Sequence, residues 1–162
     1  MSFRSFIVLV AVAILVAMHF TLRPLLDWRA GVDFLVIASL LVAVRARPGG
    51  AAVTGFVLGL AMDAMAPVSL GAGALAMTIM AFAASRLKAA FFADDLALNA
   101  VFVFIGKALF DVIYVLAEGR LSGLELLWQL MLWTPLAALA TSIVGLVALA
   151  AVRPTLDQRR HQ

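Results

Sequence analysis

Cysteine does not occur among the 162 residues, and charged side chains make up only 13% of them. Without cysteine the chain can form neither a disulfide framework nor a thiolate metal site. Histidine occurs only at His19 and His161, too few for a metal site built on several histidines. The pI is near 10.2, but the basic residues stand mostly singly and form no stripe interleaved with aromatic side chains. We therefore expect no nucleic-acid partner.

Apolar residues are in excess instead. They make up 65% of the chain, and the mean hydropathy is +1.13. A soluble domain carries about 45–50% apolar and about 25% charged residues. A chain of the present composition cannot hide its apolar side chains in a core of its own and needs lipid as solvent. The sequence therefore predicts an all-α integral membrane protein.

Six apolar segments are interpreted as membrane spans, on the scale of about 20 residues per crossing. They lie near residues 5–22, 31–44, 50–66, 69–86, 96–117 and 135–152. No small-x-small cleavage site follows the first segment, so we expect it to be retained rather than removed as a signal peptide. If the N-terminus is cytoplasmic, the inner side holds eight Lys or Arg residues and the outer side three, which favours both termini in the cytoplasm. We expect one membrane domain, residues 1–162, folded as a six-transmembrane-helix bundle.

Residues 121–133 (LSGLELLWQLMLW) precede the last span and allow two interpretations. A helix running on from here to residue 152 would be about 48 Å long at 1.5 Å per residue, too long for one straight crossing. Thr134 and Pro135 are typical of a helix start, which favours a separate helix over 121–133 lying in the outer membrane interface. The alternative is one long tilted helix with a kink at Pro135.

A charged residue, Asp63, interrupts the third apolar segment. Residues four apart share a helix face, and this spacing places Asp63 in line with three small residues. The small residues are Ala51, Gly55 and Gly59. Such a row lets a neighbouring backbone approach closely. We therefore predict a close-packing face that ends in a carboxylate.

The fifth segment carries Lys107 and Asp111 four residues apart, with Tyr114 and Glu118 continuing the same face. Counted along their helices, Asp63, Lys107 and Asp111 fall at similar depth. A lone charge at mid-bilayer costs about 2.5–3.5 kcal/mol on insertion scales. We predict that these three residues form an intramembrane polar cluster that joins two helices. A proton or ion relay is the alternative, favoured less because no chain of carboxylates continues across the membrane.

Two further polar residues receive structural interpretations. His19, near the end of the first segment, is interpreted as an interfacial residue. Asp33 opens the second segment, where the helix dipole favours a negative charge. The sequence contains no Walker loop, zinc-protease motif or Ser–His–Asp arrangement. We expect no catalytic residue, no cofactor and no metal site.

Residues 45–75 read RARPGGAAVTGFVLGLAMDAMAPVSLGAGAL. They resemble the rod shape-determining protein MreD family, whose pattern is a basic turn with proline and glycine, GFxxGLxxD, a short hairpin and LGxxAL. The first motif falls on Gly55, Phe56, Gly59, Leu60 and Asp63, and the second on Leu70, Gly71, Ala74 and Leu75. Chain length, six spans and cytoplasmic termini also fit this resemblance.

The resemblance implies a non-enzymatic scaffold of the bacterial inner membrane that helps control cell shape and lateral peptidoglycan synthesis in the elongation (rod) complex. Its direct partner would be MreC, a single-span periplasmic protein. RodA, its class B penicillin-binding transpeptidase and the MreB filament would belong to the same complex, and membrane lipid would surround the bundle.

The MreD fold is similar to that of the substrate-binding S components of energy-coupling-factor vitamin transporters. Ala13-xxx-Ala17 resembles the alanine motif with which those components engage their transporter. A vitamin-type binding component is therefore the alternative function. The outer loops offer few convergent polar and aromatic groups for a vitamin pocket, whereas small-residue grooves are plentiful, so the scaffold is favoured.

Overall fold

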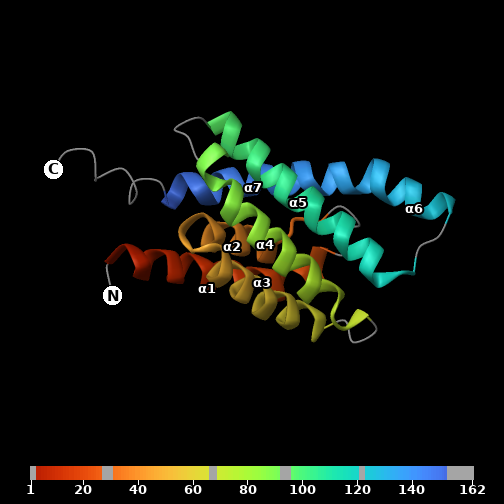
Figure 1. The fold of residues 1–162 in the computed structure, drawn as a ribbon, viewed down its shortest axis with the longest axis horizontal. Helices are drawn as coiled ribbons and strands as arrows, with labels where there is room; N and C mark the ends of the chain where they lie inside the picture. Colours follow the sequence, from red (N-terminus) through yellow and green to blue (C-terminus); the bar gives the residue numbers. More distant parts are fainter. Residues whose placement is uncertain (1–2, 27–30, 66–68, 92–95, 121–122, 153–162) are drawn as a thin grey trace.

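The computed structural model describes residues 3–26, 31–65, 69–91, 96–120 and 123–152, which contain helices and no strand (Figure 1). In chain order the α-helices are α1 (Phe3–Leu26), α2 (Phe34–Arg45), α3 (Pro48–Asp63), α4 (Ala72–Phe91), α5 (Leu96–Glu118), α6 (Leu124–Trp128) and α7 (Thr134–Val152), with a π-helical turn, η2 (Gln129–Trp133), between the last two. Each of the six apolar segments found in the sequence corresponds to one of the longer helices. The all-α fold is thus as predicted.

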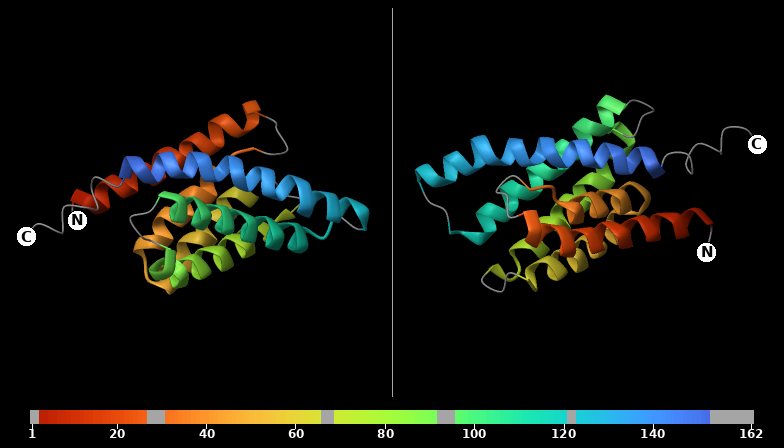
Figure 2. Two further views of the ribbon diagram at one scale, coloured as in Figure 1. Left: turned by 90° about the horizontal axis from the view of Figure 1, so that it is seen from above. Right: turned by 180° about the vertical axis from the view of Figure 1, so that it is seen from behind.

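The long helices form a bundle in which successive helices run in opposite directions (Figure 1). α1 begins and α7 ends at the same end of the molecule, as both views in Figure 2 show. α3 and α4 make the most extensive contact, while α5 packs against both α4 and α7. The hairpin formed by α3 and α4 therefore contains the largest helix–helix interface of the bundle.

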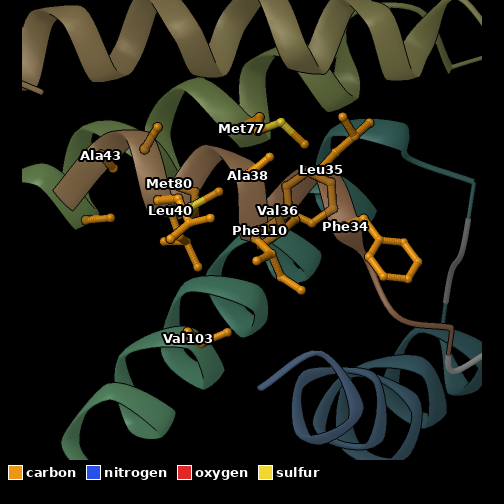
Figure 3. Close-up of a cluster of buried hydrophobic side chains, with 14 of the residues drawn as sticks. Phe34, Leu35, Val36, Ala38, Leu40, Ala43, Met77, Met80, Val103 and Phe110 are labelled. Atoms are coloured by element: carbon orange, nitrogen blue, oxygen red, sulfur yellow. The ribbon is translucent and has the colours of Figure 1, made fainter. Parts of the chain in front are cut away.

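α2 is the centre of the bundle. It contacts α1, α3, α4, α5 and α7, and nine of its twelve residues are buried (Figure 3). A helix that is apolar all round is stable only when other elements cover it on every side. At 1.5 Å per residue its twelve residues span about 18 Å, which is shorter than a hydrocarbon core of about 30 Å. α2 therefore serves as the packing core for the longer helices.

Two helical stretches are long and apolar enough to cross a membrane, Ala97–Glu118 and Leu124–Ala148. Large apolar side chains are exposed on the outer faces of the bundle, among them Ile143 and Val147 of α7 and Val53 of α3. This composition and exposure are typical of a helical membrane protein. Six complete crossings stay a prediction, because the other apolar helices are shorter.

Residues 124–152 form one continuous helical rod, made of α6, η2 and α7 (Figure 1). At its π-helical turn the backbone N–H of Thr134 donates to the carbonyl of Gln129, five residues back. The turn lies directly before Pro135, which has no N–H to continue the regular pattern. The described part of the stretch, residues 123–133, thus continues into α7 through a π-turn at the proline; a helix over 121–133 lying in the membrane interface stays a prediction.

Candidate functional site

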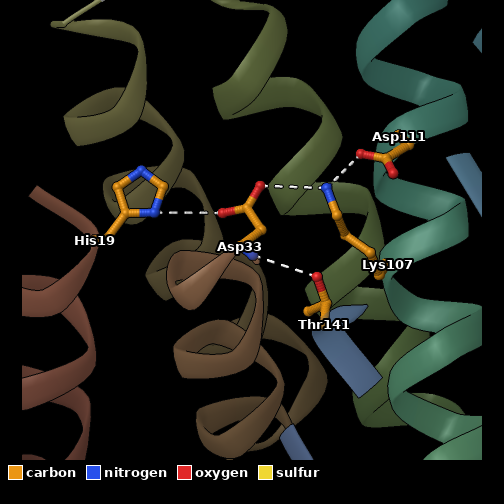
Figure 4. Close-up of polar contacts among 5 residues, drawn as sticks. All are labelled: His19, Asp33, Lys107, Asp111 and Thr141. Carbon is orange, nitrogen blue, oxygen red and sulfur yellow. Dashed lines mark hydrogen bonds and ion pairs between the residues drawn. The ribbon is translucent and has the colours of Figure 1, made fainter. Parts of the chain in front are cut away.

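Lys107 lies inside the bundle, where its ammonium group is bound between two carboxylates (Figure 4). Its Nζ donates to Oδ2 of Asp33 at 3.3 Å and to Oδ1 of Asp111. Asp33 directly precedes α2, and Asp111 lies one turn beyond Lys107 on α5. The lysine therefore joins the start of the central helix to α5.

His19 of α1 extends this arrangement on the other side of Asp33. Its Nδ1 lies 3.4 Å from Oδ1 of Asp33, so the histidine and Lys107 contact different oxygens of one carboxylate. The backbone N–H of Asp33 donates to Oγ1 of Thr141 at 3.3 Å, which brings in α7 (Figure 4). We call His19, Asp33, Lys107 and Asp111 the charged cluster. It connects α1, α2 and α5.

The charged cluster lies almost entirely out of solvent. The side chains of His19, Asp33 and Lys107 are 2%, 7% and 5% exposed, and that of Asp111 is 15% exposed. Charged groups at such positions are tolerated only with partners, because an unpaired buried charge is strongly destabilising. The ring of Phe110, whose centroid is 5.0 Å from Nζ of Lys107, adds a cation–π contact. Asp111 is the member nearest the surface.

Beyond Asp111 the same face of α5 contacts the connection between α3 and α4. The hydroxyl groups of Tyr114 and Ser69 are 3.1 Å apart and share a hydrogen bond. The ring of Tyr114 stacks on that of Phe110, with centroids 5.7 Å apart. α5 thus carries a continuous row of polar and aromatic contacts from the charged cluster to the α3–α4 hairpin.

Asp63 has a different role from Lys107 and Asp111. Its Oδ1 accepts a hydrogen bond from the backbone N–H of Gly73 at 3.0 Å, and its Oδ2 accepts from Gly71 at 2.9 Å and Ala74 at 3.0 Å. Gly73 and Ala74 lie in the first turn of α4, whose N–H groups have no partners within the helix, and Gly71 directly precedes that turn. Asp63, the last residue of α3, therefore caps the helix that follows it.

The small residues of α3 face the backbone of α4. A Cβ added to Gly55 would lie 2.5 Å from the carbonyl oxygen of Met77, and one added to Gly59 would lie 2.5 Å from Cα of Ala74. Both distances are far inside van der Waals contact, so only glycine permits this approach. Ala51 is also buried on this helix. At the other end of the hairpin, Oγ of Ser85 donates to the carbonyl of Ala46 at 2.8 Å.

The motif residues of this hairpin divide into two groups. Gly55, Gly59, Asp63 and Ala74 are buried in the α3–α4 seam, and Gly71 has a φ of 98°, a left-handed conformation suited to glycine at the start of α4. The large apolar members point away from the bundle. They are Phe56, Leu60, Leu70 and Leu75, which are 47%, 40%, 65% and 50% exposed.

The prediction that Asp63 forms one polar cluster with Lys107 and Asp111 is wrong. Counting residues along each helix placed Asp63 and Lys107 at a similar depth in the membrane. It does not show which residues surround each of them. Lys107 instead contacts Asp33 and Asp111, while both oxygens of Asp63 bind N–H groups of α4. The predicted cluster of three residues is therefore reduced to Lys107 and Asp111.

Sequence reasoning missed the two other members of the charged cluster. His19 was interpreted as interfacial but is buried beside Asp33. Asp33 was interpreted as favourable to the dipole of its own helix, yet its side chain makes no capping hydrogen bond there. The signal that could have found them is their position at facing ends of two consecutive apolar segments, where a short connection brings those ends together.

The charged cluster brings an imidazole, two carboxylates and an ammonium group, all of them titratable, into one row. No group of three or more acidic or histidine side chains within the described ranges is arranged to hold a metal ion. No protein-family model, curated protein or solved structure matches the chain. Over the described residues, fold and site are those of an all-helical protein with a glycine-packed hairpin and a buried charged cluster, and they are compatible with a helical membrane protein.

Proposed function

We propose that the protein is a non-enzymatic scaffold of the MreD kind, which binds MreC in the bacterial cytoplasmic membrane and helps the elongation complex control cell shape. In this proposal the chain crosses the membrane six times and both termini are cytoplasmic. The side chain of Ser85 contacts Ala46, so Arg45, Arg47 and Arg86 lie near one end of the bundle. Arg120 follows α5, whose direction takes it to the opposite end. This asymmetry supports a cytoplasmic face at the end with three arginines.

The observation that carries the proposal is the division of the motif residues on the α3–α4 hairpin. The glycines and Asp63 account for how the hairpin is built. The exposed Phe56, Leu60 and Leu75 add little to that packing. Exposed apolar side chains on a rigid hairpin suit contact with a single apolar helix from another protein, which packs by van der Waals contact in lipid. MreC, with one membrane span, is such a partner.

Rigidity of the hairpin also suits a scaffold. α3 and α4 are held at one end by Asp63, along the middle by Gly55 and Gly59, and at the other end by Ser85. A surface that is fixed before binding loses less conformational freedom when a partner docks. The hairpin can therefore present its outer face without rearrangement.

The alternative function is a vitamin-type binding component of a transporter. Such a component needs a roomy pocket with convergent polar and aromatic groups. One cavity between α4 and α5 is lined by apolar side chains such as Met80, Phe102 and Leu109, a lining that does not suit a polar vitamin. We favour the scaffold because of the exposed motif residues on the α3–α4 hairpin.

Co-purification tests the proposal. The tagged chain is extracted from its own cells in mild detergent, and the proteins and small molecules that accompany it are identified by mass spectrometry. We expect MreC, with RodA, its transpeptidase and MreB in smaller and more variable amounts. Transporter ATPases or a bound vitamin, without MreC, would overturn the scaffold and support the alternative.

A further inference from the structure

The cavity between α4 and α5 is a groove that opens to the surroundings of the bundle. Its walls consist of apolar residues, of which Ala83, Ala84 and Gly106 are small. These short side chains leave about 300 Å³ of space between the two helices. Leu87 and Ile105 also line the groove and are 47% and 43% exposed, so the groove is accessible from outside the bundle.

The groove has the direction and length expected for one lipid chain in a bilayer leaflet. On α4 its wall extends from Met80 to Leu87, which is about 10 Å along the axis at 1.5 Å per residue. On α5, which runs in the opposite direction, the wall extends from Phe102 to Leu109 (Figure 1). One leaflet contributes about half of a hydrocarbon core about 30 Å thick. An acyl chain that lies along the two helices therefore fits within one leaflet.

Arg86 lies at the rim of this groove, toward the end of α4. It follows Ala83 by three residues, a spacing that puts both on one helix face. Its side chain is exposed, and its guanidinium carbon is 5.3 Å from the ring centroid of Phe82, which is 42% exposed. The guanidinium therefore lies on the outer face of the bundle. α4 ends at Phe91, about 7–8 Å further along the axis, a distance close to the thickness of one interfacial layer of a bilayer.

Apolar groove and basic rim together match a molecule that has both an apolar chain and a phosphate. Guanidinium groups bind phosphate through paired, charge-assisted hydrogen bonds. Oγ of Ser85 donates to the carbonyl of Ala46, which connects the α2–α3 turn to α4. This contact brings Arg45 and Arg47 near the end of the bundle that holds Arg86. Basic sites between membrane helices at a cytoplasmic face bind anionic lipid headgroups.

We propose that the groove between α4 and α5 binds one anionic phospholipid, with an acyl chain in the groove and its phosphate on the guanidinium of Arg86. The lipid fills the space that the short side chains leave between the two helices. This site rests on the membrane position proposed above, but it does not depend on the binding of MreC.

Native mass spectrometry of the purified full chain tests lipid binding. Cell membranes are first washed at alkaline pH, and release of the chain would overturn its membrane position and the lipid site together. The chain in detergent is then titrated with phosphatidylglycerol or with zwitterionic phosphatidylcholine of the same acyl chains. We expect the first phosphatidylglycerol to bind about five-fold more tightly, the effect of one basic residue on an anionic lipid. Equal binding of the two lipids, by a chain that stays in washed membranes, would overturn the lipid site alone.

Two matched pairs of variants locate the site. Arg86→Gln removes the guanidinium at the rim, and Arg47→Gln removes an exposed guanidinium on the α2–α3 connection. Ala83→Leu fills the groove, and Ala17→Leu adds the same side chain at an exposed position of α1. We expect Arg86→Gln and Ala83→Leu each to weaken phosphatidylglycerol binding about five-fold, and their controls to change it less than about two-fold. Because Arg86 is exposed, its change leaves the packing of the bundle intact. Equal effects within either pair would overturn the proposed site.

Discussion

The carboxylate of Asp63 accepts a hydrogen bond from the backbone N–H of Gly73 across the α3–α4 connection, with 3.0 Å between Oδ1 and the nitrogen. Position 73 also requires glycine, because a Cβ there would overlap Oδ1 of Asp63. The pair explains why a charged residue ends an otherwise apolar helix. The positive end of α4 receives a negative group from the preceding helix, which satisfies N–H groups that lipid could not.

Asp63→Ala removes the acceptor for three N–H groups, and we expect it to lower the free energy of unfolding by roughly 2–4 kcal/mol. Asp63→Asn keeps one carbonyl oxygen and should cost less. Membrane abundance and thermal unfolding in detergent measure both changes. If the two variants are equally abundant and stable but equally inactive, Asp63 has a role in proton transfer rather than in capping.

Gly59→Ala inserts a methyl group against the backbone of Gly73 and Ala74, which cannot move aside as a side chain could. We expect the hairpin to open slightly, at a cost of about 1–3 kcal/mol. Gly49→Ala is the matched control, since a Cβ there meets nothing within 4 Å. Unfolding temperatures of the two variants give the comparison. Equal stability would show that α3 and α4 do not need this close approach.

Lys107→Met leaves Asp33 and Asp111 without their shared cation, and we expect a loss of about 3–5 kcal/mol, seen as reduced membrane abundance. Adding Asp33→Asn should restore part of the stability, because it removes the negative charge of one of the two carboxylates that Lys107 binds. Arg120→Met is the control. Its guanidinium pairs with Glu118 at 3.5 Å but is half exposed, so the change should cost less than about 1 kcal/mol. A Lys107→Met protein as abundant as the unaltered chain would contradict the structural role of the charged cluster.

The proposed topology puts the end of the bundle that holds Arg45, Arg47 and Arg86 in the cytoplasm. A reporter that is active only outside the cytoplasm should be silent when fused after Gly49 or after the last residue of the chain. It should be active when fused after Gly123, which precedes α6. Activity at the C-terminal fusion would contradict the even number of crossings.

Much of the fold could be predicted from the sequence, because apolar segments of this length specify helices almost by themselves. The third and fifth segments were expected over 50–66 and 96–117, close to the observed Pro48–Asp63 and Leu96–Glu118. The central position of the short helix α2 could not be predicted, since its sequence is as apolar as that of a lipid-facing helix. Burial on all sides is a property of its neighbours rather than of its own residues.

The candidate site was harder to predict for the same reason. Helical periodicity gives the face on which Asp63 or Lys107 lies, and counting gives its depth. Neither gives the rotation of one helix against another, which decides that Lys107 meets Asp33 and that Asp63 meets α4. His19 and Asp33 were interpreted singly, although their pairing depends on how the first two helices fold back on each other.

The most direct test of the scaffold is whether the outer face of the α3–α4 hairpin holds MreC. Phe56→Ala with Leu60→Ala removes two exposed side chains of this face, and Ile143→Ala with Val147→Ala removes two side chains of α7 that are more exposed still. Both double variants are compared with the unaltered chain at equal membrane abundance, and the MreC that co-purifies with each is measured. We expect the hairpin variant to retain less than a fifth of the MreC and the α7 variant to retain nearly all of it. Equal retention by both variants, or no MreC with the unaltered chain, would contradict the account.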